Sequence, residues 1–340
     1  MNHDIRPPLL FEFSVKPKVL YVADLPDWKQ DTKGQLYQKF LPELDIDIGY
    51  SRQGTTPYWE DMLKQKRYDV VCCNNIPNVS HYQTPKYVPP SFGPKFNSYY
   101  EDLLSFIREQ NKAGTQVVLT QDEADRQDIR RYAAFNAFAV NNPKAFKDFT
   151  QAGFEDIYKT YDGIDLDVFG PDVPIQNRRF KVFFTSSVMQ PEHRGVSIWK
   201  EVKNLLASQP DIDCEELFTD SFFSNSPEQL NELYNSCKIY VSFALSEGGS
   251  CDLLRAAACG LVPIIFRTEY CDHFNNLLTI ARSATSCVEK ILYLHDNQDI
   301  LNKMSQGICK EILPWDMKLM ARHWGHFIQR AVMRKKAVRF

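Results

Sequence analysis

Short runs of apolar residues alternate with stretches of mixed polarity along the first half of the chain. Four of these runs are apolar on both faces, as strands inside a parallel sheet are: Lys18–Ala23, Tyr68–Asn74, Gln116–Thr120 and Ala137–Asn142. A helical pattern at 103–107 precedes Gly114, and Asn142 followed by Pro143 is typical of a helix start. This alternation of strands and helices predicts a doubly wound parallel sheet.

The pattern is interrupted between residues 162 and 179 and then begins again. The interruption contains Gly163, Pro171 and Pro174 without any periodicity, which favours a link between two domains. Three further apolar runs predict strands: Lys181–Ser186, Ile239–Ala244 and Val262–Phe266. Helices are expected at 196–206 and from Cys251 to Cys259, with Gly260 as the stop. Two doubly wound sheets in tandem normally bind a ligand in the cleft between them.

The last forty residues are strongly basic, with nine Lys or Arg and two Asp or Glu. From Met317 to Val332, apolar positions alternate with that charge in a helical pattern. One interpretation is a helix that buries its apolar stripe on the first domain. The other is a basic amphipathic helix that lies on a membrane surface or on an acidic partner, so that peripheral membrane contact stays open.

Composition narrows the class of protein. The chain has 340 residues, of which 44% are hydrophobic and 24% charged, as in an ordinary globular protein. A net charge of −3 argues against nucleic-acid binding over the whole surface, although a local basic patch stays possible. No apolar run approaches a membrane span, and the first fifteen residues lack a signal-peptide pattern. Nine cysteines without repeated spacing favour a reducing compartment, so we expect a cytoplasmic protein.

A glycine-rich turn carries the most informative chemistry. The expected strand ending near Ala244 is followed by Gly248, Gly249 and Ser250, and then by the helix that starts at Cys251. Glycines let the backbone approach a ligand, and the free N–H groups and dipole of a helix start favour an anion such as a diphosphate. Glu247, just before the turn, can accept hydrogen bonds from sugar hydroxyls. A Gly-Gly turn can also be no more than a tight connection.

Four stretches of the chain together resemble one enzyme family. They are Ser246–Gly248 with Leu254, Ala256, Ala258, Cys259 and Gly260; Tyr161–Pro171; Ser226–Ser236; and Ile312–Trp315 with the helix after it. They resemble four features of retaining GT-B glycosyltransferases of the family-4 type. The first set resembles the donor signature, and Tyr161–Pro171 resembles the interdomain segment. Ser226–Ser236 resembles the helix before the donor strand, and Ile312–Trp315 with the helix after it resembles the C-terminal crossover.

The resemblance implies a fold and an activity. The fold is α/β, with two Rossmann-like domains that face a central cleft: an acceptor-side domain at 1–172, a donor domain at 173–315 and a crossover helix at 316–340 that packs back on the first domain. The activity is transfer of a hexosyl or pentosyl group, with retention, from a nucleoside-diphosphate sugar to a hydroxyl. A UDP-sugar is the favoured donor. No metal and no cofactor are implied, because the helix start and basic side chains take the place of a cation.

The donor residues depart from the family pattern at two positions. The second glutamate of the family, which holds the ribose, is Arg255 here, and an arginine that clamps the diphosphate is Val188. Arg194 matches the family's lysine. The predicted donor-binding set is Arg194, Gly248, Gly249, Ser250, Cys251, Asp252 and Arg255. Arginine suits phosphate through its planar donor fork, so we predict that Arg255 contacts the donor instead of pairing with a core acid. The alternative is that Arg255 points elsewhere and backbone groups hold the ribose.

The expected catalytic residues are Glu247, which orients the sugar, and Gln121. Family members often have a histidine where Gln121 stands; glutamine can hydrogen-bond a donor hydroxyl but cannot act as a base. Asp24 and Trp28 follow the first strand, where the family's acceptor loop lies. Trp28 can stack on a sugar or a base, or it can anchor the loop.

The acceptor is not named by the sequence. A saccharide or a lipid-linked saccharide is the first hypothesis. A hydroxymethylated base in a viral genome is the second, which would place the protein in a host cytoplasm. A third hypothesis is a pseudo-transferase that binds the donor with little turnover, because the pattern is altered at positions 121, 188 and 255.

Overall fold

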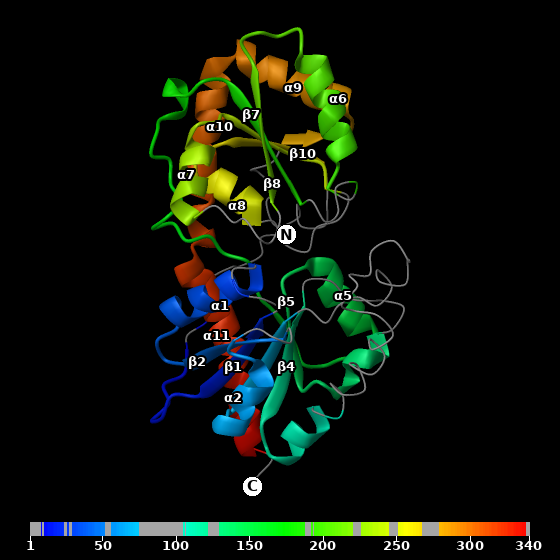
Figure 1. The fold of residues 1–340 in the computed structure, drawn as a ribbon, viewed down its shortest axis with the longest axis vertical. Helices are drawn as coiled ribbons and strands as arrows, with labels where there is room; N and C mark the ends of the chain where they lie inside the picture. The colour runs from blue at the N-terminus through cyan, green and yellow to red at the C-terminus, as the bar shows by residue number, and fades with distance from the viewer. Residues whose placement is uncertain are drawn as a thin grey trace. The chain divides into compact units, whose positions relative to one another are not determined.

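A computed structural model gives the fold and describes these residues: 8, 10–23, 26, 29–51, 56–74, 105, 107–121, 129–187, 192, 194–219, 226–244, 251–266 and 279–337. Two compact units make up the chain. We call Pro7–Tyr161 with Met320–Phe340 the N-terminal unit, and Asp162–Leu319 the core of the C-terminal unit. Each unit is a parallel sheet with packed helices, which confirms the predicted α/β fold class (Figure 1). Compact units need not be folding domains, so the boundaries at 172 and 315 stay a prediction.

The N-terminal unit is built on a six-stranded sheet in the order β2-β1-β3-β4-β5-β6, with every pairing parallel. Its strands are β1 (Lys18–Ala23), β2 (Asp45–Tyr50), β3 (Val70–Asn74), β4 (Gln116–Gln121), β5 (Ala137–Val140) and β6 (Ile157–Lys159). Its helices include α1 (Lys29–Phe40), α2 (Trp59–Gln65), α5 (Pro143–Gln151) and the short 3-10 helix η2 (Ile129–Ala134). The predicted start of α5 is confirmed, because the Asn142 side chain accepts hydrogen bonds from the backbone N–H groups of Lys144 and Ala145.

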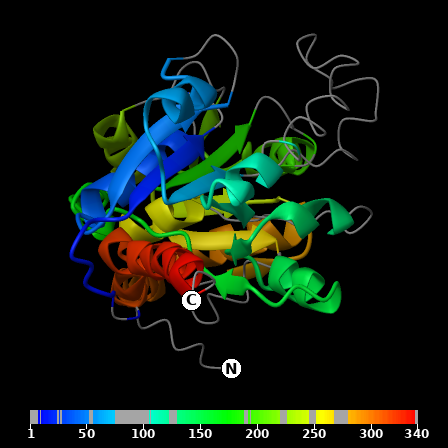
Figure 2. The same cartoon turned by 90° about the horizontal axis from the view of Figure 1, so that it is seen from below.

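The last helix, α11 (Met317–Ala337), is counted from Met320 onward with the N-terminal unit (red in Figure 1 and Figure 2). Its Trp324 ring stacks on Tyr37 of α1 with 4.2 Å between centroids, and both side chains are buried. Phe327 packs against Tyr158 of β6, and Gln329 exchanges hydrogen bonds with the backbone of Phe11. The apolar stripe of this helix is therefore covered by residues of its own unit.

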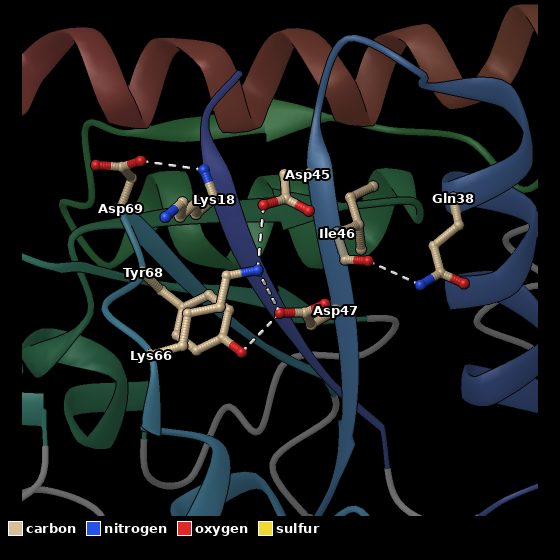
Figure 3. Close-up of polar contacts among 8 residues, drawn as sticks. All are labelled: Lys18, Gln38, Asp45, Ile46, Asp47, Lys66, Tyr68 and Asp69. Atoms are coloured by element: carbon tan, nitrogen blue, oxygen red, sulfur yellow. Dashed lines mark hydrogen bonds and ion pairs between the residues drawn. The ribbon is translucent and has the colours of Figure 1, made fainter. Parts of the chain in front are cut away.

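Strand β2 is an element that the apolar pattern did not predict. Its sequence places Asp45 and Asp47 on one face, and aspartate is unfavourable in strands. Lys66 Nζ lies 3.1 Å from Asp45 Oδ2 and 2.8 Å from Asp47 Oδ2, and the Tyr68 hydroxyl donates to Asp47 (Figure 3). Burial, followed by the contact with Asp47, raises the pKa of Tyr68. The strand is held by a polar network that residues far along the chain complete.

The C-terminal unit has a five-stranded parallel sheet in the order β11-β10-β9-β7-β8. Its strands are β7 (Lys181–Ser187), β8 (Asp213–Thr219), β9 (Ile239–Ser242), β10 (Val262–Phe266) and β11 (Thr279–Ala281). Its helices are α6 (Val196–Leu206), α7 (Pro227–Asn235), α8 (Cys251–Ala258), α9 (Ala284–Asp296) and α10 (Gln298–Glu311), with 3-10 helices η3 (Ile175–Asn177) and η5 (Leu313–Trp315). The seven predicted strands of both halves are thus confirmed, whereas β2, β6, β8 and β11 were not predicted.

The predicted link at 162–179 carries only one short helix, η3, and is held by specific hydrogen bonds. The backbone of Ile164 exchanges bonds with Trp315 and Met317, which joins the link to the crossover segment. Farther along, the buried Arg178 guanidinium donates to the carbonyls of Val173, Cys237 and Cys259 and to the amide oxygen of Asn235. Burial lowers the pKa of Arg178. Neutral oxygen acceptors therefore surround this charge, and they fix the end of the link to the C-terminal unit.

Candidate functional site

The strand order of the C-terminal unit defines where a ligand site is expected. β7 lies between β8 and β9, so the chain leaves β7 toward one side of the sheet and leaves β9 toward the other. At such a switch point, ligands bind outside the carboxyl ends of the strands. In this unit the carboxyl ends of β7 and β9 lie next to each other, with Phe184 paired in register to Val241.

Helix α8 begins just beyond the carboxyl end of β9, as the sequence predicted. Its first turn contains Cys251 and Asp252, and its buried residues face the unit's core. Its last residue is Ala258, and the turn that follows contains Gly260, where φ is +77°. There the N–H of Gly260 donates to the Ala257 carbonyl, and the N–H of Leu261 donates to that of Ala256. These are the two bonds of a Schellman ending, and they fix where this short helix stops.

A glycine brings Arg194 to the same edge of the sheet. Gly195 has a φ of +76° and precedes α6, and a Cβ on it would lie 2.6 Å from the carbonyl oxygen of Phe243. No side chain fits at that distance, so the turn that carries Arg194 packs directly on the backbone that leaves β9. Arg194 is partly buried. The predicted basic residue thus lies beside the switch point.

The carboxylate of Asp252 connects three elements of the unit. Its Oδ1 accepts from the Tyr234 hydroxyl of α7 at 3.1 Å and from Arg255 Nη1 at 3.0 Å. Its Oδ2 accepts from the Thr185 hydroxyl of β7 at 3.1 Å. The Thr185 hydroxyl has a single hydrogen, which it donates to Asp252. Tyr240 is therefore the donor in the 3.1 Å contact between its hydroxyl and Thr185 Oγ1. Burial, and then the neighbouring carboxylate, raise the pKa of Tyr234, so this tyrosine stays protonated.

Arg255 has an acid partner in the structure, which corrects the expectation that it would not pair with one. Besides the bond to Asp252, its guanidinium lies 5.5 Å from the centre of the Phe169 ring. Burial by itself lowers the pKa of Arg255, but the Asp252 charge outweighs it and the pKa is raised. The side chain is therefore a permanent cation beside the first turn of α8. Its contact with a donor stays a prediction.

Several predicted residues lie outside the described part of the chain: Asp24, Trp28, Val188, Glu247, Gly248, Gly249 and Ser250. Gln121 is the last residue of β4, at the carboxyl edge of the N-terminal unit's sheet. Within the C-terminal unit, the structure brings Arg194, Cys251, Asp252 and Arg255 to one edge.

Sequence reasoning missed the side chains that hold this edge together: Thr185, Tyr234, Tyr240 and Phe169. They come from separate elements, so no local spacing identifies them. Only the pair of Asp252 and Arg255 has a local signal, because residues three apart on a helix lie on one face.

The switch point of the N-terminal unit has a different character. There Asn74, at the end of β3, donates from Nδ2 to the Val22 carbonyl of β1 at 2.8 Å. Asn74 pairs in register with Thr120 of β4, whose hydroxyl lies 3.4 Å from Cys72 Sγ. Asn74 and Thr120 are buried and uncharged, so these two described strand residues offer neutral hydrogen-bonding groups, whereas the neighbouring helix α1 carries the buried Asp31 and Lys33.

The described residues contain neither a metal-binding cluster nor a membrane-spanning helix. Within those ranges, no group of three or more His, Cys, Asp or Glu side chains is arranged to hold a metal ion. None of the helices traced there has both the length and the apolar character needed to cross a membrane.

Comparison with known proteins identifies the fold. No protein-family model matches the sequence, and no curated protein sequence matches it. Among solved structures, HepE from Anabaena in complex with UDP-glucose has a TM-score of 0.60 at 11% identity, over 95% of this chain and 100% of that one. The lipopolysaccharide outer core galactosyltransferase WaaB has a TM-score of 0.58 at 9% identity, over 92% and 99%.

A third structure, from Listeria monocytogenes and assigned as a UDP-N-acetylglucosamine 2-epimerase, has a TM-score of 0.52 at 10% identity, over 90% of this chain and 94% of that one. Such low identities show the fold alone. The chain therefore has the GT-B fold. That fold is shared by proteins assigned to sugar transfer and to sugar epimerisation, so the reaction has to be argued from the site.

Proposed function

We propose that this protein is a retaining, metal-independent glycosyltransferase that uses a nucleoside-diphosphate sugar, with a UDP-sugar as the favoured donor. The observation that carries the proposal is the edge at the β7–β9 switch point, where Arg194 and the start of α8 lie beside the same strand end. A helix start and an arginine together form a site for a diphosphate. The donor signature at 246–260 of the sequence supports the same ligand.

The chemistry assigns a role to each group. The bond between the anomeric carbon and the diphosphate oxygen breaks, and the departing diphosphate keeps the electron pair. Arg194, Arg255 and the backbone N–H groups of residues 250–252 would stabilise that charge. Glu247 would orient the sugar as it becomes oxocarbenium-like. The acceptor oxygen attacks from the face that the diphosphate leaves, and its proton departs with the diphosphate. A hexosyl or pentosyl group is thus transferred with retained configuration.

The acceptor-side residues are proposed from the sequence and from the N-terminal unit. Gln121 would hydrogen-bond a donor hydroxyl, and Asp24 and Trp28 would contact the acceptor. Among the described residues, the neutral side chains of Asn74 and Thr120 support a hydroxyl-bearing acceptor such as a saccharide or lipid-linked saccharide. A hydroxymethylated DNA base is the competing acceptor.

A donor-binding pseudo-transferase is the second candidate function. The observation in its favour is the pairing of Arg255 with Asp252, because a cation already bound to a carboxylate is less available to a leaving group. Slow turnover with tight nucleotide binding would distinguish this candidate from an active transferase.

The test is an assay of the full chain with UDP-glucose, in the presence and absence of EDTA, against simple glycosides and hydroxymethylated DNA. We expect a glycosylated product with retained anomeric configuration by NMR, and no loss with EDTA. Glu247→Ala should abolish transfer, whereas Glu201→Ala, on the exposed side of α6, should not change it. Inverted product would contradict retention. Release of free sugar alone would favour hydrolysis or the pseudo-transferase, and absence of nucleotide binding would refute the donor site.

A further inference from the structure

Arg255 belongs to the last turn of α8, and its guanidinium is held on two sides. On one side Nη1 donates to Asp252 Oδ1 at 3.0 Å, and on the other the guanidinium lies 5.5 Å from the centre of the Phe169 ring. An arginine side chain has several rotatable bonds, and ordering it on ligand binding costs free energy. These two contacts order the side chain before any ligand arrives. A guanidinium carries five N–H donors, and the bond to Asp252 engages one of them.

The carboxylate that holds Arg255 is itself fixed. Tyr234, whose side chain is 0% exposed, donates to Asp252 from α7, and the buried Thr185 donates from β7. Thr185 in turn receives the Tyr240 hydroxyl of β9. The position of the carboxylate is thus set by two strands and a helix, and the flexible partner in the ion pair is Arg255.

Phe169 is equally well fixed. Its side chain is 5% exposed, its backbone N–H donates to the Asp165 carbonyl at 2.9 Å, and its ring meets the Tyr234 ring edge-on. Phe169 belongs to the interdomain segment, and Asp252 belongs to α8. The guanidinium therefore lies between two elements that are each anchored independently of it.

We propose that Asp252 and Phe169 are positioning residues, which hold the Arg255 guanidinium at the start of α8 for contact with the phosphates of a nucleoside diphosphate. The inference rests on the proposed function, since it takes the donor to bind at this helix start. The positioning role and simple charge repulsion predict opposite changes in nucleotide affinity when Asp252 is neutralised. Asp252 is an acid near an anion site, so repulsion alone would make its neutralisation strengthen binding. Positioning makes the same change weaken binding, because Arg255 is released into many rotamers.

The experiment is a double-mutant cycle on binding, measured by calorimetry with UDP and, separately, with uridine, on the full chain. The single variants are Arg255→Ala, Asp252→Asn and Phe169→Leu, and the double variants combine Arg255→Ala with each of the others. Asp296→Asn is the matched control, because Asp296 forms an exposed pair with His295 on α9. Asp252→Asn keeps the shape of the side chain and removes its charge.

We expect Arg255→Ala to weaken UDP binding by about tenfold to a hundredfold, and Asp252→Asn and Phe169→Leu by about threefold to tenfold each. In the Arg255→Ala background, neither Asp252→Asn nor Phe169→Leu should weaken UDP binding further. Uridine affinity should change little throughout, since uridine has no phosphate, whereas a general disturbance of the site would lower it too.

Tighter or unchanged UDP binding in Asp252→Asn would overturn the inference in favour of repulsion. Effects of Asp252→Asn and Phe169→Leu that persist in the Arg255→Ala background would assign them a merely structural role and also overturn it. If the wild-type chain binds none of UDP, GDP, ADP and CDP, the proposed function itself falls, and the inference with it. The control variant should bind UDP as the wild type does.

Discussion

The two sheets share one strand order around their switch points, yet the described side chains beside those switch points are arranged differently. Between β7 and β9, Asp252 collects hydrogen bonds from Thr185 and Arg255 and joins three elements through a charged network. Between β1 and β3, Asn74 bonds to the Val22 carbonyl, and its neighbours across the sheet are neutral. Among the described residues, the same topology therefore supports two arrangements: a network centred on a carboxylate next to the strand ends in one unit, and buried amide and hydroxyl groups on the strands themselves in the other.

This difference shows what the fold provides and what the side chains decide. A switch point brings two strand ends together and leaves space for loops beyond them, whichever ligand is bound. The ligand class depends on the groups placed there. A charged edge with a helix start suits a diphosphate, and a neutral edge suits hydroxyl groups. If that interpretation is correct, matched substitutions at the two edges should affect different ligands.

The largest expected effect is on nucleotide binding. Arg194→Ala removes a charged donor beside the β7–β9 edge, and we expect UDP to bind about 1.5–3 kcal/mol more weakly. Asn74→Ala, at the other switch point, should leave UDP affinity within about twofold, because it changes no charge. Calorimetric titration of both variants with UDP measures the contrast. Equal losses would show that the two edges do not divide the ligands in this way.

A smaller effect is expected on local stability when matched threonines lose their hydroxyls. Thr185→Val removes a bond to the Asp252 carboxylate and one from Tyr240, so we expect a loss of about 1–3 kcal/mol in the C-terminal unit. Thr120→Val removes only a weak contact with Cys72 and should cost less than about 1 kcal/mol in the N-terminal unit. Hydrogen exchange resolved by peptide reports each unit separately. Comparable losses in the two units would contradict the contrast.

Alkaline pH should destabilise the C-terminal unit through Tyr234. Burial and the Asp252 carboxylate raise its pKa, so the folded state favours the protonated form. Its contribution is complete below the ordinary tyrosine pKa of about 10 and is lost as the pH rises above that value. Tyr234→Phe should therefore flatten the fall in thermal midpoint above about pH 10. An unchanged slope in this variant would show that Tyr234 does not titrate with unfolding.

The N-terminal unit should also lose stability at alkaline pH, through the Cys72 thiol. Burial raises the pKa of the Cys72 thiol to about 12, so its contribution to stability is complete below the ordinary thiol value and is lost as the pH rises toward 12. Cys72→Ala removes that dependence at the cost of a small cavity. The thermal unfolding midpoint of this variant should lie below that of the wild type at pH 7 and should fall less steeply above about pH 9. A parallel fall in both proteins would contradict the assignment.

The strands that the sequence predicted are those in which consecutive residues are apolar. The runs at Lys18–Ala23 and Tyr68–Asn74 are apolar on both faces, and only the interior of a sheet accommodates such a run. β2 was missed because its two aspartates obscure that pattern, and their partners Lys66 and Tyr68 are supplied from elsewhere in the chain. Edge strands bury less, so their sequences carry less information about them.

For the candidate site, the sequence by itself located the start of α8 and the basic residues Arg194 and Arg255, because each follows from a few neighbouring residues. The glycine turn before α8 lies outside the described residues and stays a prediction. Only the tertiary structure decided how Arg255 is held. Asp252 is a local partner, but the ring of Phe169 and the hydroxyls of Tyr234 and Thr185 come from other elements. Hydrogen bonds and ring contacts act over a few ångströms, and which distant residues come that close is set by the packing of the whole unit.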